Sequence, residues 1–232
     1  MSQPQAPWDA VDCHSHPRRT SVVRSTGPAV IYHLVVTLQE LDPPIWRRIE
    51  VPGTFTLDRL HMVVQVAMGW TNSHLHAFTI EDRRYLPAEF TDDPPAEDEA
   101  TAPLVAVVPI ERVNEAGYTF GYEYDFGDGW EHELRAVAAT PPEPGVPYPR
   151  CSAGRGACPP EDCGGPPGFL DLLEALCDLT HPEHAELRRW AGRYFAPEIP
   201  DFRAINRQLD ALFPSATSRP PRPTRRPPGR RT

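Results

Sequence analysis

The strongest fold signal in this chain is the stretch YTFGYEYDFGDGWEHELRA at residues 118–136. Aromatic residues alternate with small or polar ones in its first part and share one face of a predicted strand: Tyr118, Phe120, Tyr122 and Tyr124. Aspartate and glycine at residues 125–129 are typical of a tight turn. Trp130 and His132 then share one face of the next strand. The stretch predicts an antiparallel hairpin with one aromatic face.

Elements on both sides of this hairpin extend the pattern. Short β-branched or apolar runs predict further strands at residues 31–38, 45–51, 75–80 and 83–86. An early helix is predicted from Thr56 as its N-cap to Gly69, which ends the apolar periodicity. Helical patterns follow the hairpin at residues 169–177, 184–194 and 201–212. We therefore expect an α+β fold, with a mostly antiparallel sheet, one early helix packed on it, and C-terminal helices.

Composition divides the chain into a folded part and two polar ends. Residues 1–28 are rich in Pro, Ser and Arg and predict a disordered leader, and residues 29–213 hold all the predicted elements. Residues 214–232 predict a disordered tail, with six arginines and no acid in its last eighteen residues. The tail could contact nucleic acid weakly through phosphates, or it could serve solubility or lie on the acidic remainder of the chain.

Residue usage excludes several classes of protein. All 23 basic residues are arginine, so enzymes that need a Schiff-base lysine and NTPases with a P-loop lysine are excluded. There is no run of eighteen apolar residues and no apolar stretch near the start that suits a secretory signal. We expect a cytoplasmic protein without membrane contact. Five cysteines, an odd number, then indicate thiols or metal ligands rather than disulfides.

Three cysteines lie close together in a predicted loop rich in glycine and proline. Cys151, Cys158 and Cys163 could hold a structural zinc ion, with a fourth ligand from His132 or from the pair His74 and His76, since zinc accepts mixed sulfur and nitrogen ligands. Their spacing is wider than the two-residue gaps of zinc knuckles, so small buried thiols explain them equally. Cys177 falls on a predicted helix and is assigned to the core.

A second group of candidate residues surrounds the hairpin. On an extended strand His74 and His76 would project on one face and could share an ion, although a hydrogen-bonded pair of histidines explains them as well. The other candidates are polar or aromatic residues at or near the two turns: Asp125, Asp128, Trp130, Glu161 and Asp162. The aspartates could hold a divalent cation or cap backbone amides of the turn. Glu161 and Asp162 could cap the following helix, and Trp130 could belong to the core.

Six segments together resemble the plasmid pRiA4b ORF-3-like family, which includes the passenger proteins called TnpR of an insertion element. They are Ile45-Trp46-Arg47-Arg48 with Val51-Pro52, residues 60–70, His74-Leu75-His76-Ala77-Phe78, residues 124–132, residues 158–165 and residues 190–206. The resemblance covers about residues 29–213. It implies a compact α+β domain and an association with mobile elements, but it implies no established activity.

Three functional hypotheses follow from the sequence. The first is a non-catalytic binding or accessory domain with a structural zinc and a protein or nucleic-acid partner. The second is a metal-dependent hydrolase or nuclease in which five side chains converge on a cation: His74, His76, Asp125, Asp128 and His132. The third is a nucleic-acid-binding protein that acts through its basic tail.

Overall fold

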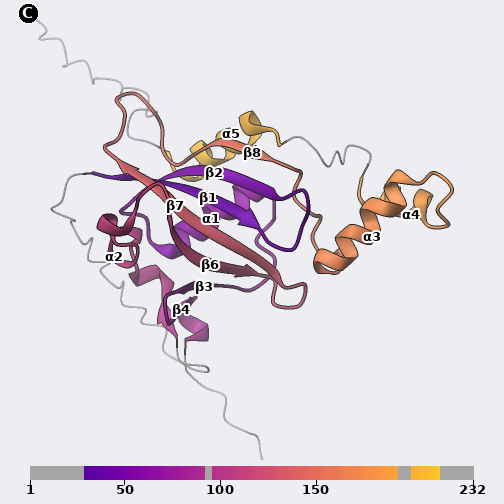
Figure 1. The fold of residues 1–232 in the computed structure, drawn as a ribbon, viewed down its shortest axis with the longest axis horizontal. Helices are drawn as coiled ribbons and strands as arrows, with labels where there is room; N and C mark the ends of the chain where they lie inside the picture. The colour runs from indigo at the N-terminus through magenta and orange to yellow at the C-terminus, as the bar shows by residue number, and fades with distance from the viewer. Residues whose placement is uncertain (1–28, 92–95, 193–199, 215–232) are drawn as a thin grey trace, which may run out of the picture.

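The computed structural model describes residues 29–91, 96–192 and 200–214. In this part of the chain eight strands form one sheet in the order β5-β4-β3-β6-β7-β1-β2-β8 (Figure 1). Their bounds are β1 Ile31–Leu38, β2 Ile45–Pro52, β3 His76–Ile80, β4 Arg83–Leu86, β5 Glu97–Asp98, β6 Tyr118–Tyr124, β7 Trp130–Thr140 and β8 Arg150–Arg155. Among these eight described strands, only β4 and β5 pair in parallel. The predicted leader and nearly all of the predicted tail, with its six arginines, lie outside the described residues.

The hairpin at residues 118–136 lies in the middle of this sheet. Strand β6 pairs with β7 in antiparallel register, with Tyr124 opposite Trp130 and Tyr122 opposite His132. The alternation of side chains along the strands puts these four residues on one buried face. The predicted hairpin and its aromatic face are therefore confirmed.

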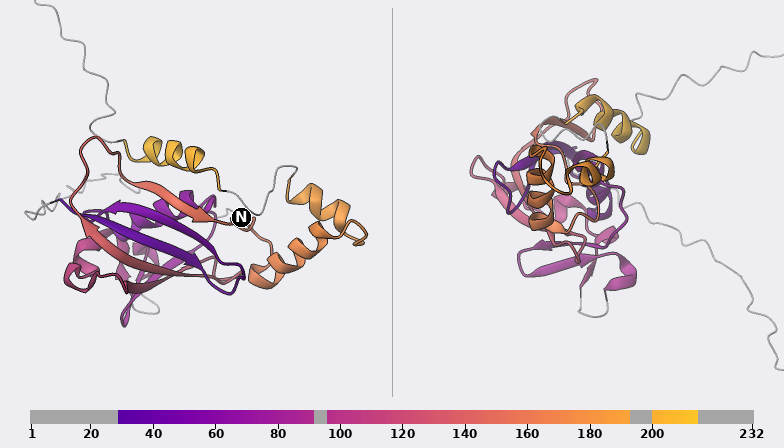
Figure 2. Two further views of the ribbon diagram at one scale, coloured as in Figure 1. Left: turned by 45° about the horizontal axis from the view of Figure 1, so that its top comes forward. Right: turned by 90° about the vertical axis from the view of Figure 1, so that its right-hand side faces the viewer.

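Five α-helices complete the described fold: α1 Leu57–Met68, α2 Leu104–Val107, α3 Gly165–Cys177, α4 His184–Trp190 and α5 Phe202–Leu212. Three 3-10 turns accompany them: η1 Ala88–Phe90, η2 Glu99–Thr101 and η3 Ile110–Arg112. The views show α1 against one face of the sheet, α5 along the edge strand β8, and α3 with α4 beyond one end of the strands (Figures 1 and 2). The α+β prediction is confirmed.

Helix α1 forms because its apolar residues recur at helical spacing and pack against the aromatic face of the sheet. Its buried apolar residues are Leu57, Leu60, Val63, Val64, Ala67 and Met68. Gly69 ends the helix with a φ of 109°, a left-handed conformation that suits glycine, and its amide donates to the carbonyl of Gln65. The core therefore lies between α1 and the sheet, with Trp130 fully buried.

Three local predictions need correction. Cys151 lies on strand β8 rather than in a loop, because residues 150–155 pair with β2 as the edge of the sheet. Helix α3 begins at Gly165, four residues before the predicted start. Cys177, predicted for the core, is exposed on the last turn of this helix. Among the described residues, no helix is both long and apolar enough to cross a bilayer.

Candidate cation site

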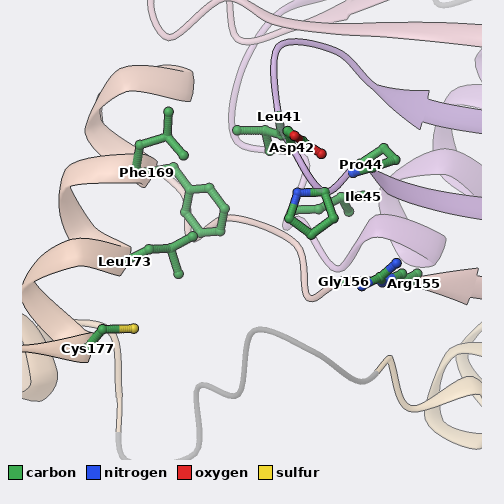
Figure 3. A pocket seen from close by; sticks show the side chains of 11 residues that line it. Leu41, Asp42, Pro44, Ile45, Arg155, Gly156, Phe169, Leu173 and Cys177 are labelled. Atoms are coloured by element: carbon green, nitrogen blue, oxygen red, sulfur yellow. The ribbon is translucent and has the colours of Figure 1, made fainter.

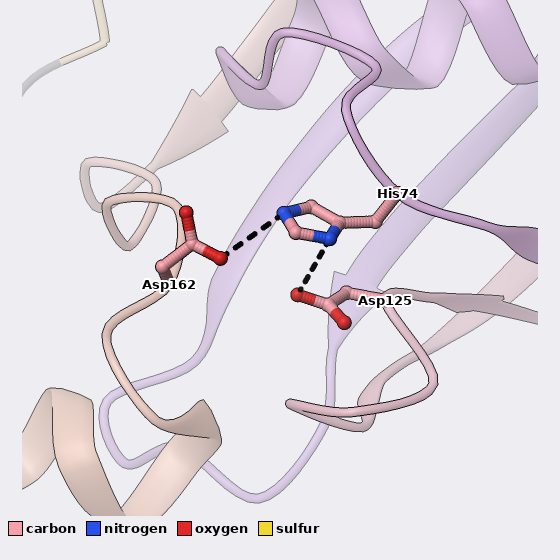
Figure 4. A group of neighbouring side chains, drawn as sticks. All are labelled: His74, Asp125 and Asp162. Atoms are coloured by element: carbon pink, nitrogen blue, oxygen red, sulfur yellow. Dashed lines mark ion pairs between the residues drawn. The ribbon is translucent and has the colours of Figure 1, made fainter.

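A histidine and two aspartates from three distant segments meet beside the β6–β7 turn. His74 precedes β3, Asp125 opens the turn, and Asp162 lies between β8 and α3 (Figure 4). Nδ1 of His74 is 3.5 Å from Oδ2 of Asp125, and Nε2 of the same ring is 3.3 Å from Oδ1 of Asp162. The imidazole therefore stands between two carboxylates that it can bridge.

The turn fixes the orientation of Asp125. Its backbone has a left-handed φ of 54°, and its amide donates to the carbonyl of Leu75 at 2.8 Å. Oδ1 of Asp125 accepts from the amides of Gly127 and Asp128 at 3.1 and 3.3 Å. This confirms the expectation that Asp125 caps turn amides, but the capping uses one carboxylate oxygen and leaves the other facing His74.

Glu161 adds a third carboxylate on the Asp162 side of the ring. Its Oε2 lies 3.7 Å from Nε2 of His74. Its Oε1 accepts from the amide and hydroxyl of Thr71 at 2.8 and 3.0 Å, and from the hydroxyl of Tyr124 at 3.1 Å. Burial raises the pKa of Tyr124 to about 12, so the phenol stays protonated and donates to the carboxylate. Glu161 is thus held in place by two neighbouring segments.

The expected helix-capping role of Glu161 and Asp162 is not found. The N-cap residue of α3 is Gly164, which has no side chain, so no side-chain hydrogen bond caps the helix there. The amide of Gly164 instead donates to Oδ2 of Asp128 at 3.1 Å, so the β6–β7 turn docks on the start of α3. Asp128 therefore positions the segment that carries Glu161 and Asp162, and its carboxylate binds that helix end rather than joining the His74 group.

His74 has an unused nitrogen in this cluster. Its Nε2 is inaccessible to solvent and makes no hydrogen bond, although two carboxylates stand within 4 Å. In the described part of the chain, His74, Asp125 and Asp162 are the one group of three or more histidine, cysteine or acidic residues whose ligand atoms all lie within 4.8 Å of one another. A lone pair beside carboxylate oxygens can coordinate a divalent cation; protonated, the ring can instead bridge the carboxylates as an imidazolium.

The cysteines do not join such a group among the described residues. Cys151 is buried and its thiol donates to the carbonyl of Ala153 at 3.6 Å. Burial raises the pKa of Cys151 to about 11, that of Cys163 to about 12, and that of Cys158 well above its usual range. Without a metal these thiols stay protonated at neutral pH. The structure does not bring the cysteines and His132 together as one group of ligands. Zinc binding by these residues stays a prediction.

His132 and Trp130 are core residues of β7. Nδ1 of His132 lies 3.0 Å from the carbonyl of Trp130, and its ring stands edge-on to Trp70 at 5.2 Å between centroids. Burial lowers the pKa of His132 to about 4, so the ring is neutral at physiological pH. Nε2 of His132 and the indole nitrogen of Trp130 are buried without hydrogen-bond partners.

His76 belongs to a separate buried network rather than to the His74 cluster. His76 is the first residue of β3, and its side chain points into the core. His74 lies before the strand, so the alternation of side chains along a strand does not place the two histidines on one face. Nε2 of His76 lies 2.9 Å from a carboxylate oxygen of Glu99, and its ring stacks on His61 at 3.5 Å. Nδ1 of His61 contacts the Tyr122 hydroxyl at 2.8 Å.

The sequence predictions missed His61 and Glu99. Burial, together with the neighbouring His76, lowers the pKa of His61 to about 3. One signal was present in the sequence, because His61 and Gln65 are polar residues four positions apart on the apolar side of α1, and both are buried. Glu99 lies in a short turn after an acidic segment and carries no comparable pattern.

The two similar proteins compared below are described only as uncharacterised or of unknown function. The family model described as plasmid pRiA4b ORF-3-like protein matches residues 30–204. The uncharacterised protein y4hQ of Sinorhizobium fredii (strain NBRC 101917 / NGR234) is 40% identical over 186 residues, which span 79% of this chain and 93% of that protein. The crystal structure of MM3350 from Methanosarcina mazei Go1, a protein of unknown function, has 33% identity and a TM-score of 0.68, and the match covers 76% of this chain and 98% of that chain. The chain belongs to the plasmid pRiA4b ORF-3-like family.

Proposed function

We propose that this chain is a non-catalytic binding domain whose functional site is a divalent-cation site, in which Nε2 of His74, Asp162 and Glu161 hold the ion and Asp125 orients the ring through its other nitrogen. The observation that carries the proposal is the solvent-inaccessible Nε2 of His74, which has no hydrogen bond and faces carboxylate oxygens. A cation between these atoms would use that lone pair and offset the repulsion among the clustered carboxylates.

The donor set determines which ions fit. One imidazole with carboxylates is harder than the thiolate set of a structural zinc site and suits Mn²⁺, while imidazole also accepts Zn²⁺. A site made of cysteine thiolates would instead favour Zn²⁺ over Mn²⁺. The side chain of Asp162 is 74% exposed, so an ion could enter from solvent and could bridge to a partner's carboxylate or phosphate.

A binding role fits better than hydrolysis because the five side chains of the predicted catalytic set do not converge. His74 and Asp125 are adjacent, while His76 pairs with Glu99 and His132 packs against Trp70. The partner is a protein or a nucleic acid, and the association with mobile elements implied by the TnpR proteins concerns gene context rather than a residue of this chain.

Calorimetric titration of the full-length, metal-free chain with Mn²⁺ and Zn²⁺ tests the proposal. We expect one ion per chain, with affinity about a hundredfold weaker in His74→Ala and clearly weaker in Asp162→Asn. The matched control Asp82→Asn, an exposed aspartate after β3, should bind like the wild type. Zinc binding that survives in His74→Ala and disappears in Cys158→Ser would place the metal at the cysteines and contradict the proposal.

A further inference from the structure

A mostly apolar pocket of about 440 Å³ lies at the end of the sheet and is lined by none of the residues of the His74 cluster. One wall is the β1–β2 turn with Leu41 and Ile45, and the opposite wall is helix α3 with Phe169 and Leu173 (Figure 3). Pockets of this size and character are typical binding sites for small organic molecules.

The backbone at Gly156 lies close to the β1–β2 turn in one wall of this pocket. Gly156 follows β8 with a φ of 76°, and a Cβ atom there would stand 2.7 Å from Cγ1 of Ile45. Glycine therefore lets the chain pass close under the turn. The carbonyl of Arg155 accepts from Nη1 of Arg47 at 2.9 Å, so the adjoining strand end is fixed by a buried arginine.

Two charged side chains line the pocket besides the apolar residues: Asp42 and Arg155. Within the described residues neither side chain makes an ion pair or hydrogen bond, so the exposed guanidinium of Arg155 has no carboxylate partner. In Figure 3 the carboxylate of Asp42 is directed away from the α3 wall. An unpaired cation beside an apolar pocket is complementary to an anionic group attached to an apolar body.

We propose that this pocket binds an amphipathic organic anion, a carboxylate with an unbranched apolar body. The apolar body would lie between Phe169, Leu173 and Ile45, and the carboxylate would accept hydrogen bonds from the guanidinium of Arg155. Arginine suits this role because its planar donors match a carboxylate in two-bonded geometry. The site is separate from the proposed cation site and does not depend on it.

Calorimetry with decanoate, at concentrations where it is monomeric, tests the charge recognition. We expect decanoate to bind the full-length chain more tightly than decanol, and Arg155→Gln to weaken decanoate binding about tenfold while decanol binding is unchanged. Arg48→Gln, an exposed arginine on β2, is the matched control. Asp42→Asn should bind decanoate at least as tightly as the wild type, because it removes a like charge. Tighter binding of decylammonium than of decanoate, lost in Asp42→Asn, would overturn the proposal.

The location is tested independently through Cys177, an exposed free thiol that lines the pocket one helical turn beyond Leu173. Saturating decanoate should slow alkylation of Cys177 by a maleimide several-fold, as measured by peptide mass spectrometry, while the rate at Cys163 stays constant. Equal protection of both cysteines, or of neither, would show that decanoate does not occupy this pocket and would overturn the proposal.

Discussion

The side-chain amide of Asn206 on α5 makes a pair of hydrogen bonds with the backbone of Cys151 on β8. Its Oδ1 accepts from the Cys151 amide at 2.8 Å, and its Nδ2 donates to the Cys151 carbonyl at 2.9 Å. The amide thus takes the place of a neighbouring strand at the edge of the sheet, where unpaired backbone groups would otherwise need solvent or another chain.

Replacing this amide should loosen the edge strand. We expect Asn206→Ala to lower the free energy of unfolding by about 2 kcal/mol, because two backbone groups lose their partners. Urea denaturation of this variant beside Gln208→Ala, an exposed position on the same helix, measures the difference. Equal midpoints for the two variants would refute the pairing.

A second prediction concerns two glycines with similar backbone angles. Gly165 has a φ of 70°, and a Cβ there would stand 2.2 Å from the carbonyl oxygen of Asp128; Gly129 has a φ of 68° and open space around it. We expect Gly129→Ala to lower the free energy of unfolding by about 1 kcal/mol, from backbone strain alone. Gly165→Ala should lower the free energy of unfolding by at least about 2 kcal/mol more than Gly129→Ala, because the β6–β7 turn must move away from α3. Similar thermal midpoints for the two variants would count against this docking.

The buried histidines predict a loss of stability in acid. His61 and His132 have pKa values of about 3 and about 4 in the folded protein, below their ordinary value, because burial disfavours the charged ring. Between those values and about pH 6.5 the unfolded chain binds more protons, so stability falls as the pH falls. Each ring contributes up to about 1.4 kcal/mol per pH unit. Urea denaturation from pH 4.5 to 7 should show this slope, and His132→Gln should reduce it; an unaltered slope in that variant would exclude His132 as a contributor.

Tyr124 should support cation binding without touching the ion. Its hydroxyl donates to Glu161 and accepts from the amide of Ser73 at 3.0 Å, so it links the carboxylate to the segment before His74. We expect Tyr124→Phe to weaken Mn²⁺ binding about tenfold with a small change in melting temperature. Tyr148→Phe, a tyrosine far along the chain between β7 and β8, is the control. Wild-type affinity in Tyr124→Phe would show that Glu161 needs no such support.

The sequence predicted those parts of the fold whose signal is local. The alternation along residues 118–124 and the Asp-Gly turn give β6 and β7, and the apolar period of residues 57–68 gives α1. Strand β8 was missed because residues 150–155 contain Ser, Ala and Gly, which have little strand preference, and its pairing with β2 is decided by tertiary contact.

The candidate site shows the same limit. His74, Asp125, Glu161 and Asp162 were each singled out, and one hypothesis grouped His74 with Asp125. That hypothesis also included His76 and His132, and Glu161 and Asp162 were assigned to a helix cap. Their meeting depends on Asp128 holding the start of α3 against the hairpin turn, a contact between residues 36 positions apart. No local sequence pattern encodes that contact. The sequence therefore identified the residues of the site but did not show which of them come together.

Anomalous diffraction from crystals of the full-length chain soaked in Mn²⁺ locates a bound ion and tests whether it lies beside His74. We expect one strong anomalous peak within coordination distance, about 2.0–2.3 Å, of Nε2 of His74 and the carboxylate of Asp162, absent in crystals of His74→Ala. A peak elsewhere in wild-type crystals, or no peak at a saturating Mn²⁺ concentration, would contradict the cation site.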